Sequence, residues 1–325
     1  MTDFADFLAA DNPLVGEVRD ALRRKRTFRV DALADSLDVS PKRVRDAIDA
    51  LRDAGFRIPT EVEGHVELNR VAPTSDDPHR LPLELLDGDR VRFGVVSDTH
   101  LCSKHCALPE LSLAYDYFER EGIADVFHPG DLVAGLGIFP GQHNEITHHT
   151  FEDQTDFAEK HYPRRTGVTT HIIGGNHDLE GAFGRMGADP VRAVANRRDD
   201  FHYLGPYSAW VELVNGGYIH LLHGKGGMSY AYSYRAQKIV DGYGQGRKPG
   251  ALILGHYHVQ GNFSPRSVNT MFPACFEWQS VQFGARLGLR PTVGFHVVEA
   301  QLGDDGSFVE WTPRWKPFFE GRTVS

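Results

Sequence analysis

Residues 250–260 read GALILGHYHVQ, a short apolar run that ends in two histidines separated by one tyrosine. An apolar run of this length, bounded by glycines, is typical of a buried strand. Polar residues at the carboxyl end of a strand lie where ligands bind in α/β sheets. Other apolar runs in this chain end in the same way, and together they decide the fold.

Five polar clusters each follow an apolar run: Asp98-Thr99-His100, Gly130-Asp131, Gly175-Asn176-His177-Asp178, His223-Gly224 and Gly255-His256-Tyr257-His258. The carboxyl ends of strands in an α/β sheet gather on one edge. Residues i and i+2 of a strand point to the same side, which predicts that Asp98 and His100 converge, as do His256 and His258. The neighbouring glycines leave room for backbone to approach an ion.

From residue 91 the apolar runs first alternate with helical stretches and later pair as hairpins. Residues 91–98, 124–131 and 168–178 read as strands, separated by helical patterns over 111–123 and 145–162. The Asn-Gly-Gly sequence in 209–224 and the Gly-Asp-Asp-Gly sequence in 292–315 predict hairpin turns. This order predicts an α/β fold in which two sheets pack face to face with helices outside.

Residues 1–70 read as a separate domain of three helices followed by a hairpin, and residues 71–90 as a linker rich in Pro, Asp and Ser. Ser40 is the expected N-cap and Pro41 the first residue of the third helix. The segment 33–56 resembles the helix-turn-helix of winged-helix domains, with Lys42, Arg43 and Arg45 at the exposed start of its third helix. Nucleic-acid binding and a packing or protein-binding role both stay open.

Residues 91 to about 285 carry, in order, the motifs D-x-H, G-D, G-N-H-[DE], H and G-H-x-H. This series resembles the calcineurin-like metallophosphoesterases, and it makes residues 91–325 the expected phosphoesterase domain. The stretches SDTHLCSKH, GQHNEITHHTFEDQ and LILGHYH look like a phage and bacterial branch labelled metallophosphatase or DNA-repair exonuclease-like.

The resemblance implies seven ligands for two divalent cations. It assigns Asp98, His100 and His258 to the first cation, and Asn176, His223 and His256 to the second. Asp131 bridges the two. His177 becomes the acid or charge stabiliser at the leaving oxygen. His220 precedes His223 on the same strand, but the glycine after His223 favours His223 as the ligand.

Two divalent ions roughly 3.5–4 Å apart can share a hydroxide that attacks the phosphorus, and can clamp the phosphoryl oxygens of an in-line displacement. Mixed nitrogen and oxygen ligands favour Mn, Fe or Zn over Ca or Mg, and Mn is the expected ion in an assay.

Some residues near the motifs have two interpretations each. Asp178 either orients His177, and so belongs with the catalytic residues, or caps a helix. Gln142 and His149, in the loop after Asp131, either touch substrate or belong to a solvated helix start. Arg235 is the favoured phosphate contact within the aromatic and basic stretch after His223.

Composition limits the function classes. The chain is 41% hydrophobic and 24% charged, as in globular proteins, and its formal charge of −9 argues against a broad basic surface. The sequence shows neither a signal-peptide pattern nor an apolar stretch that could span a bilayer, so no membrane partner is expected. Three cysteines fit a reducing compartment, which predicts a cytoplasmic location.

Three functions are compatible with these observations. The favoured one is a dinuclear metal-dependent phosphoesterase acting on a phosphodiester, with nucleic acid as a candidate substrate placed by the N-terminal domain. The second is a phosphomonoesterase acting on a small molecule or a phosphoprotein. The third is a DNA-binding regulator whose phosphoesterase domain is a non-catalytic scaffold. The oligomeric state does not follow from the sequence.

Overall fold

The structure of the protein is a computed structural model that describes residues 13–24, 27–53, 65–67, 78–81, 83, 86, 88–243, 248–304 and 306–320. The chain divides into two compact units, Met1–Thr74 and Ser75–Ser325. Residues His79–Arg80 form strand β3 of the second unit, and Leu81 and Leu83 are buried in its core. Part of the segment expected to be a linker therefore belongs to the second unit.

The first unit contains α2 (Pro13–Arg24), β1 (Thr27–Arg29), α3 (Val30–Ser36), α4 (Pro41–Asp53) and β2 (His65–Glu67). Its core gathers apolar side chains spaced three or four apart on the three helices, among them Val18, Leu33, Val44, Ile48 and Leu51. The predicted N-cap is confirmed, because the Arg43 N–H donates to Ser40 Oγ at 3.4 Å. Pro41 opens the helix as predicted.

Strand β1 was not predicted, because the sequence analysis expected only helices before the hairpin of residues 1–70. It pairs antiparallel with β2, with Phe28 opposite Val66. Thr27 and Phe28 favour extended backbone, which explains why the helix ends before them. Of the hairpin predicted to follow the three helices, the described residues include only β2. The winged helix-turn-helix assignment accordingly stays a prediction.

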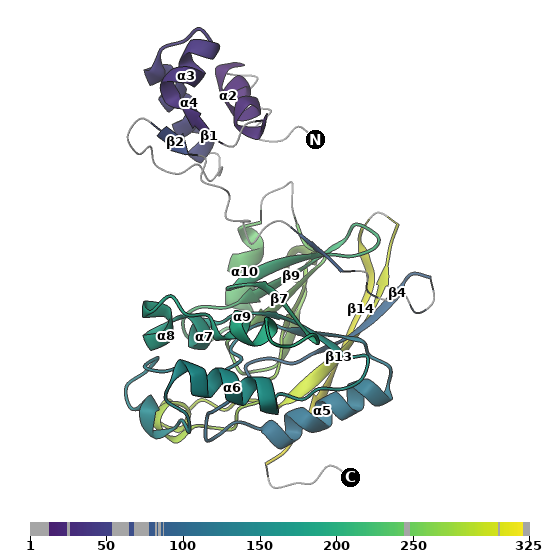
Figure 1. The fold of residues 1–325 in the computed structure, drawn as a ribbon. Helices are drawn as coiled ribbons and strands as arrows, with labels where there is room; N and C mark the ends of the chain where they lie inside the picture. The colour runs from purple at the N-terminus through teal and green to yellow at the C-terminus, as the bar shows by residue number, and fades with distance from the viewer. Residues whose placement is uncertain are drawn as a thin grey trace. The chain divides into compact units, whose positions relative to one another are not determined.

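The described residues of the second unit form two six-stranded sheets (Figure 1). The first has the order β14-β13-β4-β5-β6-β7, and the second has the order β11-β12-β10-β9-β8-β3. The first sheet comprises β4 (Arg90–Val95), β5 (Asp125–His128), β6 (Thr169–Ile173), β7 (Phe201–Gly205), β13 (Gly294–Leu302) and β14 (Phe308–Pro317). The second comprises β3, β8 (Ser208–Glu212), β9 (Tyr218–His223), β10 (Ala251–Gly255), β11 (Gly261–Phe263) and β12 (Asn269–Phe272).

The alternation of side chains along the strands builds a layered core. On β10, Ala251 and Ile253 join the apolar cluster shared by both sheets, whereas Leu252 and Leu254 pack with helix α10 (Ser233–Asp241) on the outer face. The outer face of the first sheet is covered by α5 (Leu108–Arg120), α6 (Phe151–His161) and α9 (Pro190–Ala195). This arrangement confirms the predicted α/β sandwich.

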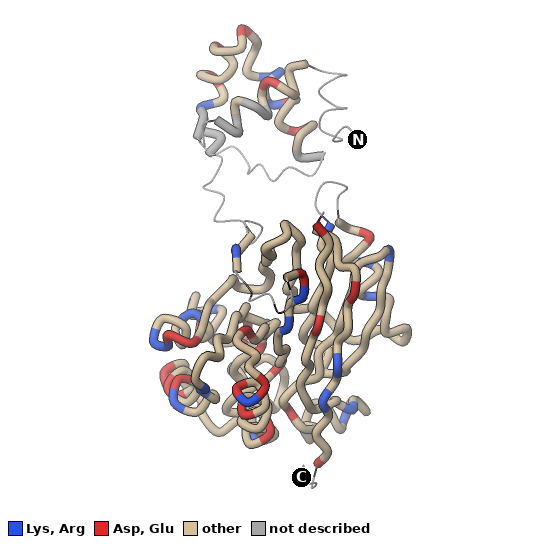
Figure 2. The backbone as a smooth tube through the Cα atoms, turned by 90° about the vertical axis from the view of Figure 1, so that its right-hand side faces the viewer, with Lys and Arg blue, Asp and Glu red and all other residues tan. Residues whose placement is uncertain are grey.

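The two predicted hairpins are confirmed, because β8 pairs antiparallel with β9 and β13 pairs antiparallel with β14. Strands β3, β7, β11 and β12 and helices α8 (Gly181–Arg185), α9 and α10 were not predicted. Helix α7 (Asn176–Leu179) corrects the end of the segment 168–178, which was expected to be a strand. Figure 2 shows charges of both signs on the helices that cover the first sheet. Within the described ranges, every helix is too short or too polar to traverse a bilayer.

Candidate metal centre

The seven predicted ligands lie at or just beyond the carboxyl ends of parallel strands. Asp98 and His100 follow β4, Asp131 follows β5, and Asn176 follows β6 as the first residue of α7. From the second sheet, His223 is the last residue of β9, and His256 and His258 follow β10. Strands β9 and β10 are parallel and place His223 beside Gly255. The chain therefore brings ligands from both sheets to one edge.

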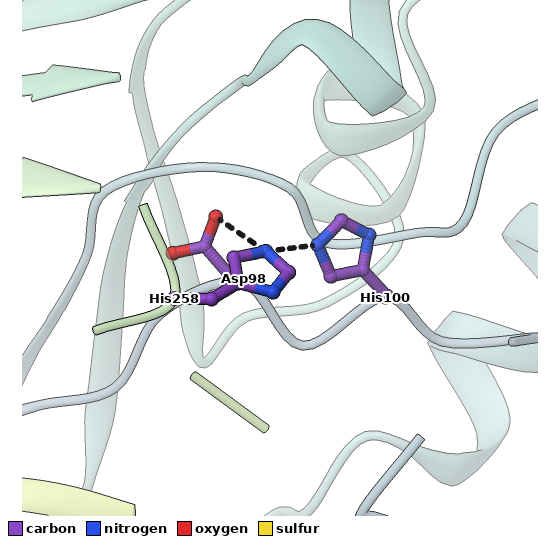
Figure 3. Close-up of side chains that lie close together, drawn as sticks. All are labelled: Asp98, His100 and His258. Atoms are coloured by element: carbon purple, nitrogen blue, oxygen red, sulfur yellow. Dashed lines mark hydrogen bonds and ion pairs between the residues drawn. The ribbon is translucent and has the colours of Figure 1, made fainter. Parts of the chain in front are cut away.

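The first group of ligands is Asp98, His100 and His258 (Figure 3). The two Nε2 atoms of His100 and His258 are 3.0 Å apart, and His258 Nε2 is 3.5 Å from Asp98 Oδ1. One ligand atom from each residue lies within 4.8 Å of the others. Asp98 is fixed from behind, because its oxygens accept the His256 N–H at 3.0 and 3.2 Å and a hydrogen bond from Ser97 Oγ.

The second group surrounds the side-chain oxygen of Asn176. This oxygen is 3.0 Å from His223 Nε2 and 2.8 Å from His256 Nδ1. Asp131 Oδ2 lies 3.3 Å from His223 Nε2 and, towards the first group, 3.7 Å from His100 Nε2. Asp131 therefore stands between the two groups, in the position expected of a bridging ligand.

Left-handed backbone conformations direct most of these side chains towards one another. Five of the seven predicted ligands have positive φ: Asp98 (48°), His100 (42°), Asp131 (58°), His256 (87°) and His258 (56°). Non-glycine residues adopt this conformation rarely, at a cost of about 1–3 kcal/mol each. The prediction that strand alternation brings them together is wrong in its mechanism, because these five residues lie beyond the ends of their strands.

The buried charge of the site fits a pair of cations. Asp98 and Asp131 are 0% and 1% exposed, and their ion pairs within the described chain are with histidines. Burial opposes ionisation of Asp131, but the charge of His223 holds the pKa of this carboxyl well below its usual range. Burial likewise opposes the protonation of His223, yet Asp131 raises the pKa of that imidazole to about 9. Histidine protons thus supply the positive charge that divalent cations would supply at this site.

His100 is already in the form that binds metals. Burial lowers the pKa of His100 to about 4, so its imidazole is neutral at pH 7 and Nε2 can offer a lone pair. Together, two carboxylates, an amide oxygen and four imidazoles form the mixed oxygen and nitrogen donor set that Mn, Fe and Zn prefer. The residues present therefore fit divalent metal ions.

His177 lies beside the first group. The centroid of its ring is 4.3 Å from the centroid of the His100 ring, and its backbone N–H donates to Asp131 Oδ1 at 2.8 Å. Its Nδ1 is 2.8 Å from the Ala134 carbonyl oxygen, which fixes the ring. His177 also forms a close group with His100 and Asp131, so its position suits a metal ligand as well as a proton donor.

Asp178 does not have the orienting role considered for it. Its carboxylate accepts the N–H groups of Leu132, Val133 and Gly175 at 3.2, 3.0 and 2.9 Å. The Ala134 carbonyl, rather than Asp178, holds the His177 ring. Asp178 is not the N-cap of α7 either, because Gly175 holds that position; as the third residue of the helix, Asp178 caps it by accepting the Gly175 N–H and ties it to the segment after Asp131.

Glu277 is a residue of this site that sequence reasoning missed. Its Oε2 is 4.0 Å from His100 Nε2 and 3.9 Å from His258 Nδ1, and Ser103 Oγ donates to its Oε1 at 2.6 Å. It shares a small pocket with His100 and His177. Burial opposes its ionisation, but the neighbouring histidines hold the pKa of Glu277 below its usual range. The one sequence feature that could have suggested a role for Glu277 is its position as an acidic residue between two aromatic residues, Phe276 and Trp278.

The three weaker predictions have different outcomes. Gln142 is buried, and its amide closes its own loop by pairing with Ala134 O at 2.7 Å and Ile138 N at 2.9 Å. This use of both ends of the amide argues against a substrate contact. His149 is exposed, with Nε2 3.0 Å from His143 O. Arg235 is half-buried on α10 and donates to Gly227 O at 3.4 Å.

Replacing Gly175 with alanine is expected to lower hydrolysis of a small phosphoester by at least about 100-fold. A Cβ atom at this position would lie 2.2 Å from Asp131 Oδ1 and 2.6 Å from Asp131 N, so the Asp131 carboxylate would have to move. A displacement of about 1 Å in a catalytic group can cost about 100-fold in rate. Steady-state kinetics with a nitrophenyl phosphoester measures the loss.

Gly227→Ala is the matched control, because a Cβ there meets nothing within 4 Å. It should keep activity within about twofold of the unsubstituted chain. An active Gly175→Ala variant would contradict the placement of Asp131.

Comparison with known proteins agrees with the motif series. Residues 91–280, more than half of the chain, match the calcineurin-like phosphoesterase superfamily domain. No curated protein matches the chain.

Solved structures resemble the chain at low identity. An archaeal phosphodiesterase is 15% identical with a TM-score of 0.37, and the match covers 70% of this chain and 100% of that one. A Streptococcus pneumoniae protein described as a predicted phosphoesterase is 14% identical (TM-score 0.34; 70% and 98% covered). Zinc-bound Vps29 of Entamoeba histolytica is also 14% identical (TM-score 0.36; 70% and 99% covered). The domain match over residues 91–280 establishes that the chain belongs to the calcineurin-like phosphoesterase superfamily.

Proposed function

We propose that the chain hydrolyses phosphodiesters at a pair of divalent metal ions. The observation that carries this proposal is the position of Asp131 between two groups of metal-binding side chains. Asp98, His100 and His258 would hold one cation, and Asn176, His223 and His256 the other, with Asp131 shared. Mn is the expected ion in an assay, and Fe and Zn suit the same ligands.

When bound, the two cations supply positive charge for the phosphoryl oxygens and a water-derived nucleophile that is ionised near neutral pH. The chain supplies positioning. His177 is held through Nδ1 by the Ala134 carbonyl, which leaves Nε2 as the nitrogen that can serve a substrate. In its protonated form this nitrogen donates a proton to the leaving oxygen, the role of a general acid.

Glu277 favours a diester over a monoester. A diester carries one negative charge beside its phosphorus, whereas a monoester carries up to two at neutral pH. The partly buried Glu277 carboxylate lines the pocket shared with His100 and His177, so it repels the second charge. We therefore place the phosphomonoesterase second.

A panel of four substrates tests the proposed function: bis-nitrophenyl phosphate, nitrophenyl phosphate, a cyclic nucleotide and labelled DNA, each with Mn(II). Turnover of the diesters with a higher kcat/KM than the monoester is the expected result. A clear preference for nitrophenyl phosphate would instead establish a phosphomonoesterase. No turnover of any phosphoester with Mn, Fe or Zn would favour the non-catalytic scaffold of a DNA-binding regulator.

Glu277→Gln is expected to raise the monoester-to-diester ratio of kcat/KM by about tenfold. Glutamine keeps the size of the side chain and a partner for Ser103, but removes the charge that opposes a dianion. Because the prediction concerns a ratio, a general loss of activity does not imitate it. An unchanged ratio would show that Glu277 does not set the preference.

The N-terminal unit carries a separate proposal, that α4 contacts nucleic acid. Lys42, Arg43 and Arg45 are exposed at the start of this helix, as the sequence analysis expects. Lys42 Nζ pairs with Asp46 at 3.0 Å, which reduces the positive charge available to phosphates. Triple substitution of the basic residues by glutamine should weaken DNA binding without changing hydrolysis of bis-nitrophenyl phosphate.

A further inference from the structure

One segment of this acidic protein is almost free of acidic residues. Residues 213–276 contain one of the 44 Asp and Glu residues of the chain but six of its 35 Lys and Arg residues. The one acidic residue, Asp241, is paired with Arg266. The same segment supplies His223, His256 and His258 to the metal centre. The positive charge therefore belongs to the part of the fold that borders the site.

Three tyrosines in this segment are exposed. Tyr230, Tyr232 and Tyr234 have exposed fractions of 106%, 53% and 47%. They lie in the loop after β9 and at the start of α10, whose buried face consists of Ala236 and Val240. The tyrosines are therefore not part of the core, and three large rings face solvent within five positions.

Cationic side chains accompany these rings. Lys225 and Lys238 are exposed, and the Lys238 ammonium lies 5.8 Å from the centroid of the Tyr234 ring. Arg235 is half-buried and donates to Gly227 O, which ties α10 to the loop. We name Lys225, Tyr230, Tyr232, Tyr234, Arg235 and Lys238 the tyrosine surface.

The loop that carries the tyrosine surface starts at the metal centre. Its loop begins directly after His223, the last residue of β9. In the same loop, the Gly226 carbonyl oxygen is 3.0 Å from His256 Nε2. The tyrosine surface therefore belongs to the same loop that contacts two of the predicted ligands.

We propose that the tyrosine surface binds single-stranded nucleic acid, with bases stacked on the tyrosines and phosphates paired with Lys225, Arg235 and Lys238. This proposal rests on the proposed phosphodiesterase function and names its substrate class. Aromatic rings interleaved with basic groups suit single strands, because unpaired bases expose the faces that stack. Duplex DNA hides those faces, and a neutral protein partner would gain nothing from the excess positive charge.

Fluorescence anisotropy with a labelled 20-nucleotide single strand tests the proposal, using the full chain with EDTA so that no cleavage occurs. The double variant Tyr230→Ala/Tyr232→Ala should weaken binding by at least about tenfold. The variant Lys225→Gln/Lys238→Gln should weaken binding and make it less dependent on salt. Phe319→Ala, which also removes an exposed ring (54%), serves as the control and should bind like the unsubstituted chain.

Hydrolysis of bis-nitrophenyl phosphate with Mn(II) separates this proposal from the proposed function. The tyrosine variants should hydrolyse this small diester within about twofold of the unsubstituted chain, yet lose cleavage of the labelled strand. Three results would overturn the proposed role of the tyrosine surface: no binding of the single strand, binding unchanged by the tyrosine substitutions, or equal binding of single and double strands. None of them would contradict hydrolysis of the small diester. If the unsubstituted chain hydrolysed no diester, the proposed function would be overturned instead.

Discussion

Asp131→Asn is expected to lower kcat/KM for bis-nitrophenyl phosphate by about 1000-fold or more, which corresponds to about 4 kcal/mol of transition-state stabilisation. Asp131 is the one predicted ligand that stands between both groups, 3.3 Å from His223 Nε2 and 3.7 Å from His100 Nε2. Asparagine keeps an oxygen that can accept the His177 N–H, now bonded at 2.8 Å, so the local backbone is preserved. The substitution removes the shared negative charge that would hold two cations close together.

The matched control is Asp125→Asn, at the first residue of β5, the strand that Asp131 follows. Asp125 Oδ1 is 2.7 Å from His171 Nε2 and lies outside the ligand groups. This variant should keep near-normal activity and bind the same number of metal ions, as measured by elemental analysis of the purified protein. If Asp131→Asn kept more than a tenth of the activity with two ions bound, the shared-ligand arrangement would be wrong.

Metal removal is expected to lower the apparent melting temperature of the chain by about 10 °C. Without cations, the buried Asp98 and Asp131 depend on histidine protons for compensation. A ligand present at about 1000 times its Kd stabilises the folded state by about 4 kcal/mol, and a unit of this size gains roughly 2–4 °C per kcal/mol. Differential scanning fluorimetry with EDTA, followed by addition of Mn(II), measures the loss and its recovery.

Asp131→Asn serves here as a variant whose melting should respond little to EDTA, because its metal centre is already impaired. Mg(II) should restore less stability than Mn(II), since imidazole ligands suit Mg poorly. Identical melting curves with and without EDTA, for a protein shown to contain metal before treatment, would contradict a metal centre that stabilises the fold.

The layered fold could be predicted from the sequence because local patterns of residues determine its strands and turns. Apolar runs such as ALIL at 251–254 fix buried strands, and the Asn-Gly-Gly turn after Val214 fixes the hairpin of β8 and β9. Strand β1 was missed because only three residues form it and its partner β2 lies over 30 positions away. Pairing over such a distance leaves no local mark in the sequence.

Residues of the candidate site could be predicted where polar residues follow apolar runs. Contacts that depend on tertiary geometry could not be predicted. Asp98 and His258 are brought together by left-handed backbone, which no pattern of side chains announces. Glu277 enters the site from a segment without a motif, and Asp178 turns its carboxylate to three N–H groups rather than to His177. Residue type was thus predictable, but the direction of each side chain was not.

The contribution of ligands from two different sheets has a consequence for biosynthesis. Asp98, Asp131 and Asn176 follow strands of the first sheet, whereas His223, His256 and His258 come from the second. A nascent polypeptide cannot assemble this donor set before residue 258 has left the ribosome and both halves have docked. Under the proposed ligand assignment, metal capture is therefore a late step of maturation, and shorter translation intermediates lack the complete donor set.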